Sequence, residues 1–160
     1  MENRLSEPYC EFDPEEWENT TEIPVKFDIS SDTDLLSCHY DEKSNGSCEL
    51  HQDVSTVTTE EISNAILKHF QQAPSDPTTQ RLYNTVVGIE IPGFSLNSRT
   101  FRAGHNNGID IICLIAYGEV NFSGSDIVNN LGLRSSLFTA GFEALDVTFS
   151  KNAAFDHSRF

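Results

Sequence analysis

Two pairs of soft metal ligands lie within fourteen residues of this chain: Cys38 beside His39, and Cys48 three residues before His51. Zinc in proteins takes four such ligands at the corners of a tetrahedron, commonly supplied as close pairs. The side chains of adjacent residues point apart, so Cys38 and His39 are poorly placed to bind one ion together, although Cys10 is a possible replacement. We therefore predict no stoichiometric metal and no cofactor, and keep Cys38, Cys48 and His51 as weak candidate zinc ligands.

The segment from Asp41 to Gly46 has the spacing of oxygen-bearing residues that begins an EF-hand calcium loop. In that loop the third position supplies an oxygen ligand and the twelfth supplies a bidentate glutamate. Here these two positions hold Lys43 and Gln52. Because a cation in a ligand position opposes calcium binding, the sequence argues against a calcium site.

No pairing of a nucleophile with a base stands out along the chain. His69, His105 and His157 have no neighbour at a spacing that suggests a catalytic triad. The run Ser123-Gly124-Ser125-Asp126 is not a nucleophile elbow, and no phosphate-binding Gly-Lys-Ser/Thr loop occurs. We predict that the protein is not an enzyme. A small enzyme or ligand-binding domain with an unidentified pocket stays as a further alternative.

Aromatic and aliphatic side chains are interspersed among acids near the start of the chain. Such acids keep apolar anchors solvated, which leaves the anchors available to enter a groove of a partner protein. The candidate partner-binding residues are Tyr9, Phe12, Trp17, Leu35, Leu36, Cys38 and Tyr40. We predict that they bind a protein partner, and the alternative is a merely solvated tail.

Two short linear motifs overlap these anchors. Residues 34–42 (DLLSCHYDE) resemble a degenerate Leu-x-Cys-x-Glu ligand of pocket proteins, with Leu36 and Cys38 in place and Tyr40 at the acidic position. Asp32 followed by Leu35 and Leu36 matches a sorting-type motif. Both patterns are short enough to arise by chance, so neither identifies a partner.

The charge distribution divides the chain of 160 residues after Val57. Residues 1–57 contain 15 acids and three bases, a net charge of −12, whereas residues 58–160 contain ten acids and seven bases, a net charge of −3. High net charge with few apolar residues is typical of disordered segments. We predict an acidic, mostly disordered N-terminal arm over residues 1–57 and a core domain over residues 58–160. The total charge of −15 opposes direct nucleic-acid binding and a polybasic membrane anchor.

One stretch of the arm has the pattern of a strand. Apolar residues occupy every second position of residues 22–30 (EIPVKFDIS), which indicates a half-buried strand. Pro24 restricts this strand to an edge of the sheet or places Pro24 at an end of the strand, because proline has no N–H to donate. We predict that the strand docks on the core domain and that residues 31–57 form a long, mobile loop.

The first element predicted in the core domain is a helix near residues 59–72. Thr58 and Glu61 have the spacing of a capping box, and the prolines at 74 and 77 end the helical pattern. One face of this helix is apolar and consists of Ile62, Ala65, Ile66 and Phe70.

Strand-forming residues follow this helix. Residues 81–91 are rich in Tyr, Thr, Val and Ile, and residues 108–120 are apolar on both faces, as in a central strand. Pro92-Gly93 and Asn107-Gly108 have the composition of tight turns, and residues 94–102 between them have the pattern of a solvent-facing strand. Together these segments predict an antiparallel meander of three strands over residues 81–121.

The last forty residues complete the predicted domain. Residues 124–131 have the caps of a short helix, residues 135–142 are compatible with one or two further helical turns, and residues 145–150 alternate as a last strand. The polar tail from Lys151 is expected to fray, and no internal repeat of 20–50 residues is apparent. The predicted fold is α+β, with a mainly antiparallel sheet made of the meander plus flanking strands, and one or two helices.

The order of these elements resembles that of rhabdovirus matrix proteins. An acidic arm, a strand, an amphipathic helix and an apolar meander follow one another over about residues 20–122. The resemblance implies a viral structural subunit that self-associates. Those proteins are basic enough to meet membrane and nucleocapsid, and this chain departs from them with its net charge of −15.

The function expected from these patterns is a non-enzymatic protein interaction or regulatory role. The acidic arm would present its anchors to a protein partner, or mask a basic surface by its charge. The alternative is an assembly subunit that self-associates through its sheet. Because no apolar run suits a signal peptide or a membrane span, we expect a cytoplasmic or nuclear protein with reduced cysteines that is neither secreted nor inserted in a membrane.

Overall fold

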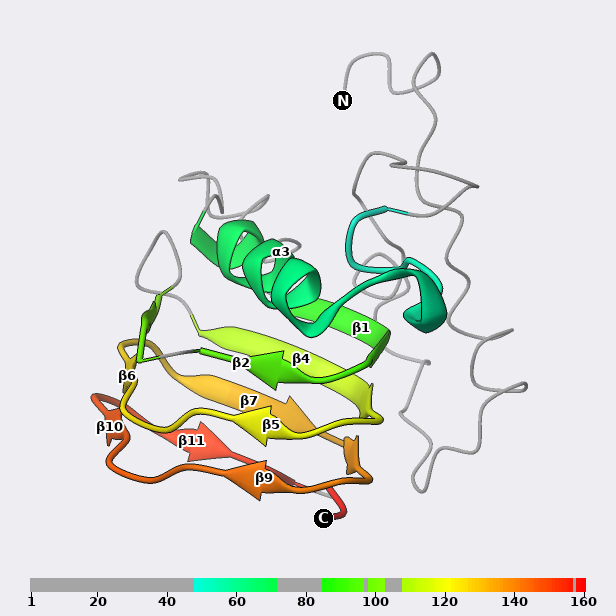
Figure 1. The fold of residues 1–160 in the computed structure, drawn as a ribbon. Coiled ribbons are helices and arrows are strands. Elements are labelled where there is room, and N and C mark those ends of the chain that lie inside the picture. Colours follow the sequence, from blue (N-terminus) through cyan, green and yellow to red (C-terminus); the bar gives the residue numbers. More distant parts are fainter. Residues whose placement is uncertain (1–47, 72–84, 97, 103–107, 157) are drawn as a thin grey trace, which may run out of the picture.

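The computed structural model describes residues 48–71, 85–96, 98–102, 108–156 and 158–160 (Figure 1). This part begins with a short 3-10 helix, η3 (Val54–Thr56), and an α-helix, α3 (Thr59–Gln71). The predicted capping box is confirmed: the backbone N–H of Thr58 donates to Glu61 Oε2 at 2.9 Å, and the N–H of Glu61 donates to Thr58 Oγ1 at 3.1 Å. The predicted apolar face of the helix is buried.

The rest of the described chain consists of short strands. Their bounds are β1 (Thr85–Ile91), β2 (Phe94–Ser95), β3 (Thr100–Phe101), β4 (Ile109–Ala116), β5 (Val120–Asn121), β6 (Asp126–Ile127), β7 (Leu131–Arg134), β8 (Leu137–Phe138), β9 (Phe142–Glu143), β10 (Thr148–Phe149) and β11 (Ala153–Ala154). They form three sheets, and every pairing between them is parallel. The prediction of a mainly antiparallel sheet is therefore wrong.

The register shows that the chain winds into a parallel β-helix. Ile109 pairs with Leu131, and Leu131 pairs in turn with Ala153. Equivalent positions are 22 residues apart, as in the hydrogen bond that the N–H of Asn152 donates to Asn130 Oδ1. The same spacing joins β5 to β9 and β6 to β10, while the first circuit, from β1 to β4, is longer. We call each circuit a coil. The expectation of no internal repeat is wrong, because each coil stacks on the equivalent part of the next.

Two columns of residues in the left-handed region of backbone conformation form corners of the coils. Gly88, Cys113 and Ser135 have φ values of 69°, 60° and 52° and stack at the same register. The first column bends β4 in its middle, so its first half pairs with β7 and its second half with β8. The second column consists of Ser98, Gly124 and Asp146, with φ values of 60°, 71° and 54°.

These corners explain why the predicted meander does not form. The turn at Pro92-Gly93 stacks on the equivalent turn of the next coil, where Phe94 N–H donates to the carbonyl oxygen of Glu119 at 3.1 Å. The chain therefore changes direction there without reversing, and β1 finds its partner β4 one circuit later. The strand predicted over 94–102 is two strands of two residues, and Phe94, Leu96 and Phe101 are buried in it instead of facing solvent.

The two helices predicted after residue 120 are also absent from the described structure. Gly124 occupies a corner, so it does not cap a helix, and the residues after it form β6 and β7. Residues 135–142 contain β8, and the strand predicted over 145–150 is reduced to β10. The tail from Lys151 does not fray, because β11 pairs with β7.

The core fills the inside of the coils and the space under α3. Ile62, Ile66 and Phe70 of the helix belong to one cluster of buried apolar side chains with those of the coils. The void that remains within this cluster is about 10 Å³. Cys48 and Leu50 are 1% and 3% exposed in the same cluster. The boundary predicted after Val57 stays a prediction, and a fragment designed to fold should keep residues 48–57.

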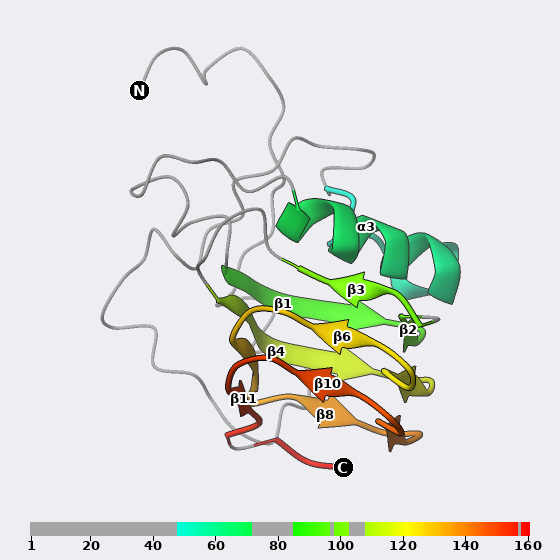
Figure 2. The ribbon, with the colours of Figure 1, turned by 90° about the vertical axis from the view of Figure 1, so that its left-hand side faces the viewer.

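The helix α3 covers one end of the β-helix, beside β1 and β2 (Figures 1 and 2). Two hydrogen bonds fix it there: Ser95 N–H donates to Ser63 Oγ at 3.0 Å, and Arg99 Nη1 donates to Asn64 Oδ1 at 2.6 Å. The last coil and the final residues of the chain lie at the opposite end in both views. The two ends of the β-helix are therefore chemically different.

Candidate interaction surface

Phenylalanines concentrate at the end of the β-helix that is remote from α3. Four of them lie one coil after positions that are 0–2% exposed, namely Val120, Ile127, Leu133 and Phe138. We call these four the C-terminal end surface: Phe142, Phe149, Phe155 and Phe160. Phe149 is 38% exposed and Phe160 is 70% exposed, while Phe142 and Phe155 are half-buried. Because no further coil covers them among the described residues, apolar side chains at positions that are buried in the preceding coil are exposed here.

Three of the four rings of this surface, those of Phe142, Phe155 and Phe160, contact one another. The ring of Phe160 stacks on that of Phe138 with centroids 5.0 Å apart. Phe142 lies edge-on to Phe155 at 5.5 Å and to Phe160 at 5.7 Å. Such aromatic pairs are stabilising beyond the area that they bury. These three rings therefore form a cluster that continues the core outward through Phe138.

Strand edges surround these rings. Within the described residues, β9 and β10 are the outermost strands of their sheets. The carbonyl oxygens of Gly141 and Glu143 accept hydrogen bonds from Val120 and Phe122 of the preceding coil. Because successive residues of a strand direct their backbone groups to opposite sides, Phe142 between them directs its own N–H and C=O away from the coils. An edge of this kind can pair with another strand.

The charge of this end differs from that of the rest of the chain. Residues 131–160 contain three acids and three bases, so their side chains have a net charge of zero. Residues 48–71, which include α3, contain four acids and one base, a net charge of −3. In a chain of total charge −15, residues 131–160 are therefore neutral as a group, and the last 22 residues, 139–160, contain three acids and two bases, a net charge of −1.

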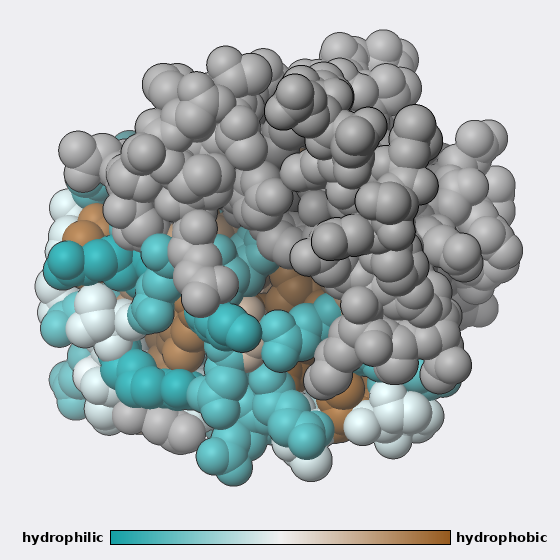
Figure 3. Space-filling view, turned by 90° about the horizontal axis from the view of Figure 1, so that it is seen from above, coloured by the Kyte–Doolittle hydropathy of each residue, from teal (hydrophilic) through white to brown (hydrophobic). Residues whose placement is uncertain are grey.

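The α3 end is more polar. Seen from that side, most of the described surface is hydrophilic, with smaller hydrophobic patches (Figure 3). A groove of about 260 Å³ runs beside the helix, lined by Glu49, Glu61 and Lys68 among others. Val57, Ile62 and Ala65 give it some apolar wall, but it is open to solvent and does not enclose a ligand as typical small-molecule sites do.

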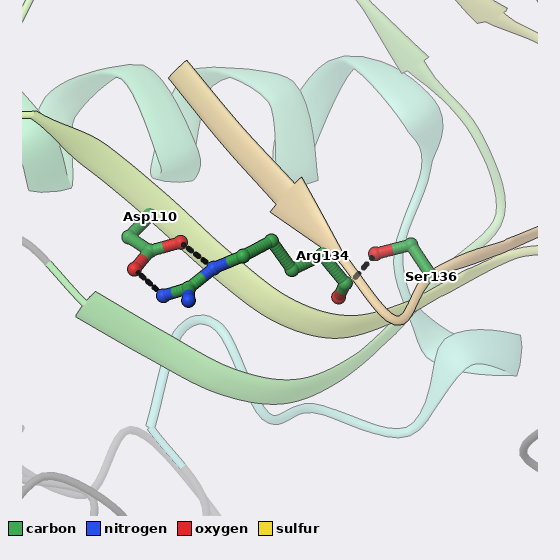
Figure 4. A network of polar contacts seen from close by, with 3 residues as sticks. All are labelled: Asp110, Arg134 and Ser136. Atoms are coloured by element: carbon green, nitrogen blue, oxygen red, sulfur yellow. Dashed lines mark hydrogen bonds and ion pairs between the residues drawn. The ribbon is translucent and has the colours of Figure 1, made fainter. Parts of the chain in front are cut away.

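A polar network lies on the side wall of the coils (Figure 4). Arg134 of β7 forms an ion pair with Asp110 of β4, donating from both Nε and Nη2. The hydrogen bonds that Arg134 donates to Asp110 raise the pKa of Arg134 above its ordinary value, and the charges of Asp110 and Asp156 act in the same direction. The network joins adjacent coils, and we assign it a structural role.

The buried serine of this network also replaces a backbone interaction. Ser136 Oγ accepts from the N–H of Leu114 at 3.2 Å and donates to the carbonyl oxygen of Arg134 at 3.2 Å. One coil later, Ser158 Oγ accepts from the N–H of Ser136 at 3.1 Å. Both hydroxyls are therefore occupied by backbone groups at a corner, which explains why serine recurs at this position.

The residues proposed from the sequence as a site are largely outside this part. The partner-binding candidates Tyr9, Phe12, Trp17, Leu35, Leu36, Cys38 and Tyr40, and the strand at 22–30, lie outside the described residues. Of the weak zinc candidates, the structure brings together Cys48 and His51, with Sγ and Nδ1 3.2 Å apart. In the part of the chain that is described, no group of three or more His, Cys, Asp or Glu is placed to hold a metal.

The C-terminal end surface was not predicted from the sequence. Its signal was the recurrence of apolar residues at the spacing of one coil, visible in Ile111, Leu133 and Phe155 and again in Phe138 and Phe160. That signal is weak, because three coils with different apolar residues at each position give little identity from repeat to repeat. The exposed phenylalanines become apparent only when the residues of each coil are aligned with the equivalent residues of the next coil.

The described helices include none long and apolar enough to cross a membrane. The element order behind the resemblance to rhabdovirus matrix proteins is not observed, since a parallel β-helix replaces the meander. Comparison of the chain with protein-family models, with curated proteins and with solved structures gives no match.

Proposed function

We propose that this protein is a non-enzymatic protein-interaction module and that the C-terminal end surface is its contact site. The observation that supports this proposal is the exposure of Phe149 and Phe160 at positions that are buried one coil earlier. An apolar cluster bordered by open strand edges is suited to a partner that covers the rings and pairs with the edges. The near-neutral C-terminal segment, residues 131–160, also repels an acidic partner less than the rest of the chain does.

Binding through the acidic arm stays a prediction beside this one. The arm precedes η3 and α3 in the chain, and α3 lies at the end of the β-helix opposite the C-terminal end surface (Figure 1). A contact at that surface therefore leaves α3 uncovered. Binding through the arm and binding through the C-terminal end surface use different residues. Substitutions in the arm should impair only the first, and substitutions at the C-terminal end surface only the second.

Photo-crosslinking tests the contact site. Benzoylphenylalanine in place of Phe160 in the full chain should give a discrete covalent adduct with a protein on irradiation, in purified solution or in a native extract. An excess of unlabelled wild-type chain should compete for that adduct, and the double variant Phe149→Glu, Phe160→Glu should not. Tyr117, which is 48% exposed on an earlier coil, is the matched control position and should give no competed adduct.

The absence of a competed adduct at position 160, under conditions in which the chain is folded, would contradict the proposal. The mass of an adduct identifies the other protein. The competed adduct at position 160 therefore tests the contact site, and the mass of the adduct separately identifies the partner.

A further inference from the structure

We infer that the partner of the C-terminal end surface is a second copy of this chain, joined to the first about a twofold axis so that association stops at the dimer. This inference rests on the proposed function and names its partner. It is carried by three observations: the asymmetry of the two ends, the charge of the last coil and the direction of its strands.

The asymmetry of the ends decides the symmetry of the complex. A head-to-tail stack would require the C-terminal end of one copy to meet the opposite end of the next. That end is covered by α3, whose Ile62, Ile66 and Phe70 are at most 2% exposed within the core. Only the C-terminal end remains open among the described residues, so two copies meet with the same surface, and an interface of this kind closes.

The charge distribution favours the same arrangement. Two chains of net charge −15 repel each other at most orientations. The exception is the C-terminal segment of residues 131–160, whose three acids and three bases cancel. With these segments in contact, the α3 ends, at −3 each over residues 48–71, lie farthest apart. Repulsion between charges is screened over about 10 Å at 0.1 M salt, so the two α3 ends then repel each other little.

The strands of the last coil are compatible with the twofold axis. An axis perpendicular to the β-helix, passing through its end, places each end strand opposite a strand that runs in the reverse direction. The open edges of β9 and β10 then meet as antiparallel edges, which can exchange backbone hydrogen bonds directly. The rings of Phe149 and Phe160 are covered in the same contact.

Sedimentation velocity of the full chain over a wide concentration range tests the inference. The wild-type chain should pass from monomer to dimer and go no further. The variant Phe149→Glu, Phe160→Glu should raise the dissociation constant of the dimer by at least about 30-fold, as expected for the loss of central apolar contacts. The control Tyr117→Gln changes an exposed ring on an earlier coil and should leave the dissociation constant unchanged.

Hydrogen exchange of the wild-type chain gives a measurement that needs no variant. Amides of residues 142–149 should exchange more slowly in the dimer than in the diluted monomer, and those of α3 should exchange equally in both. Species larger than the dimer would overturn the twofold closure, and a dimer that survives the double substitution would overturn its location. A chain that stays monomeric while position 160 still crosslinks to another protein would overturn this inference and leave the proposed function standing.

Discussion

Phe138 and Phe160 occupy the same position of successive coils, and their rings stack with an angle of 10° between the planes. Phe138 is 2% exposed and Phe160 is 70% exposed. One stacked pair therefore connects the core to the surface that we propose as the contact site. A phenylalanine at this position has a structural role in one coil, and the phenylalanine at the equivalent position of the next coil is available for binding.

This pair predicts two different outcomes for the same substitution. Phe138→Ala should lower the free energy of unfolding by about 3–5 kcal/mol, because it removes a buried ring and leaves a cavity. Phe160→Ala should lower it by only about 1 kcal/mol, because the ring is 70% exposed and the loss comes mainly from its contacts with the rings of Phe138 and Phe142. Equilibrium denaturation of the two variants at a concentration where the chain is monomeric measures the difference. Equal losses would show that Phe160 is part of the core.

Local signals in the sequence are sufficient for α3. Thr58 and Glu61 mark its start, and thirteen residues contain enough helical turns to show an apolar face. The strand β4 is also indicated by its composition, because eight consecutive residues are long enough to show burial on both sides. Elements of this length can be predicted from the pattern of their own residues.

The β-helix as a whole has no such local signal. Strands of two residues, such as β5 and β6, are too short to show the alternation that identifies a strand. Their partners lie a full coil away, and the corners at Gly124 and Asp146 have the composition of ordinary turns or helix caps. Antiparallel neighbours were the natural expectation from turn residues, and only pairing between residues one full coil apart selects the parallel arrangement.

The corner at Asp146 gives a second prediction. Its φ of 54° lies in the left-handed region, which Asp tolerates and a β-branched residue does not. Asp146→Val should lower the free energy of unfolding by about 1–2 kcal/mol, whereas Asp146→Gly should leave it unchanged or raise it by up to about 1 kcal/mol. Ala144→Val, at an exposed position nearby without a positive φ, is the control for the added bulk. Similar losses in the Val variants at 144 and 146 would contradict the role of the corner.

A hydrogen bond between two adjacent coils changes the titration of one tyrosine. The hydroxyl of Tyr117 donates to Glu90 Oε1 at 2.6 Å. This bond, followed by partial burial and the charge of Glu90, raises the pKa of Tyr117 from 10.0 to about 12. Ionisation of the phenol removes its proton and with it the hydrogen bond, so the protonated form is favoured in the folded state.

The titration of Tyr117 is therefore predicted to differ from that of an unfolded chain. Because its folded pKa lies above its unfolded value, the stabilisation from this bond is fully present below about pH 10 and is lost as the pH rises towards about 12. Ultraviolet absorbance of tyrosinate should show that Tyr117→Phe removes one tyrosine ionisation near pH 12. Glu90→Gln should shift that same ionisation to lower pH, since the amide has no charge to oppose the phenolate. A Tyr117→Phe titration that differs from the wild type only near pH 10 would show that the bond to Glu90 does not hold the proton.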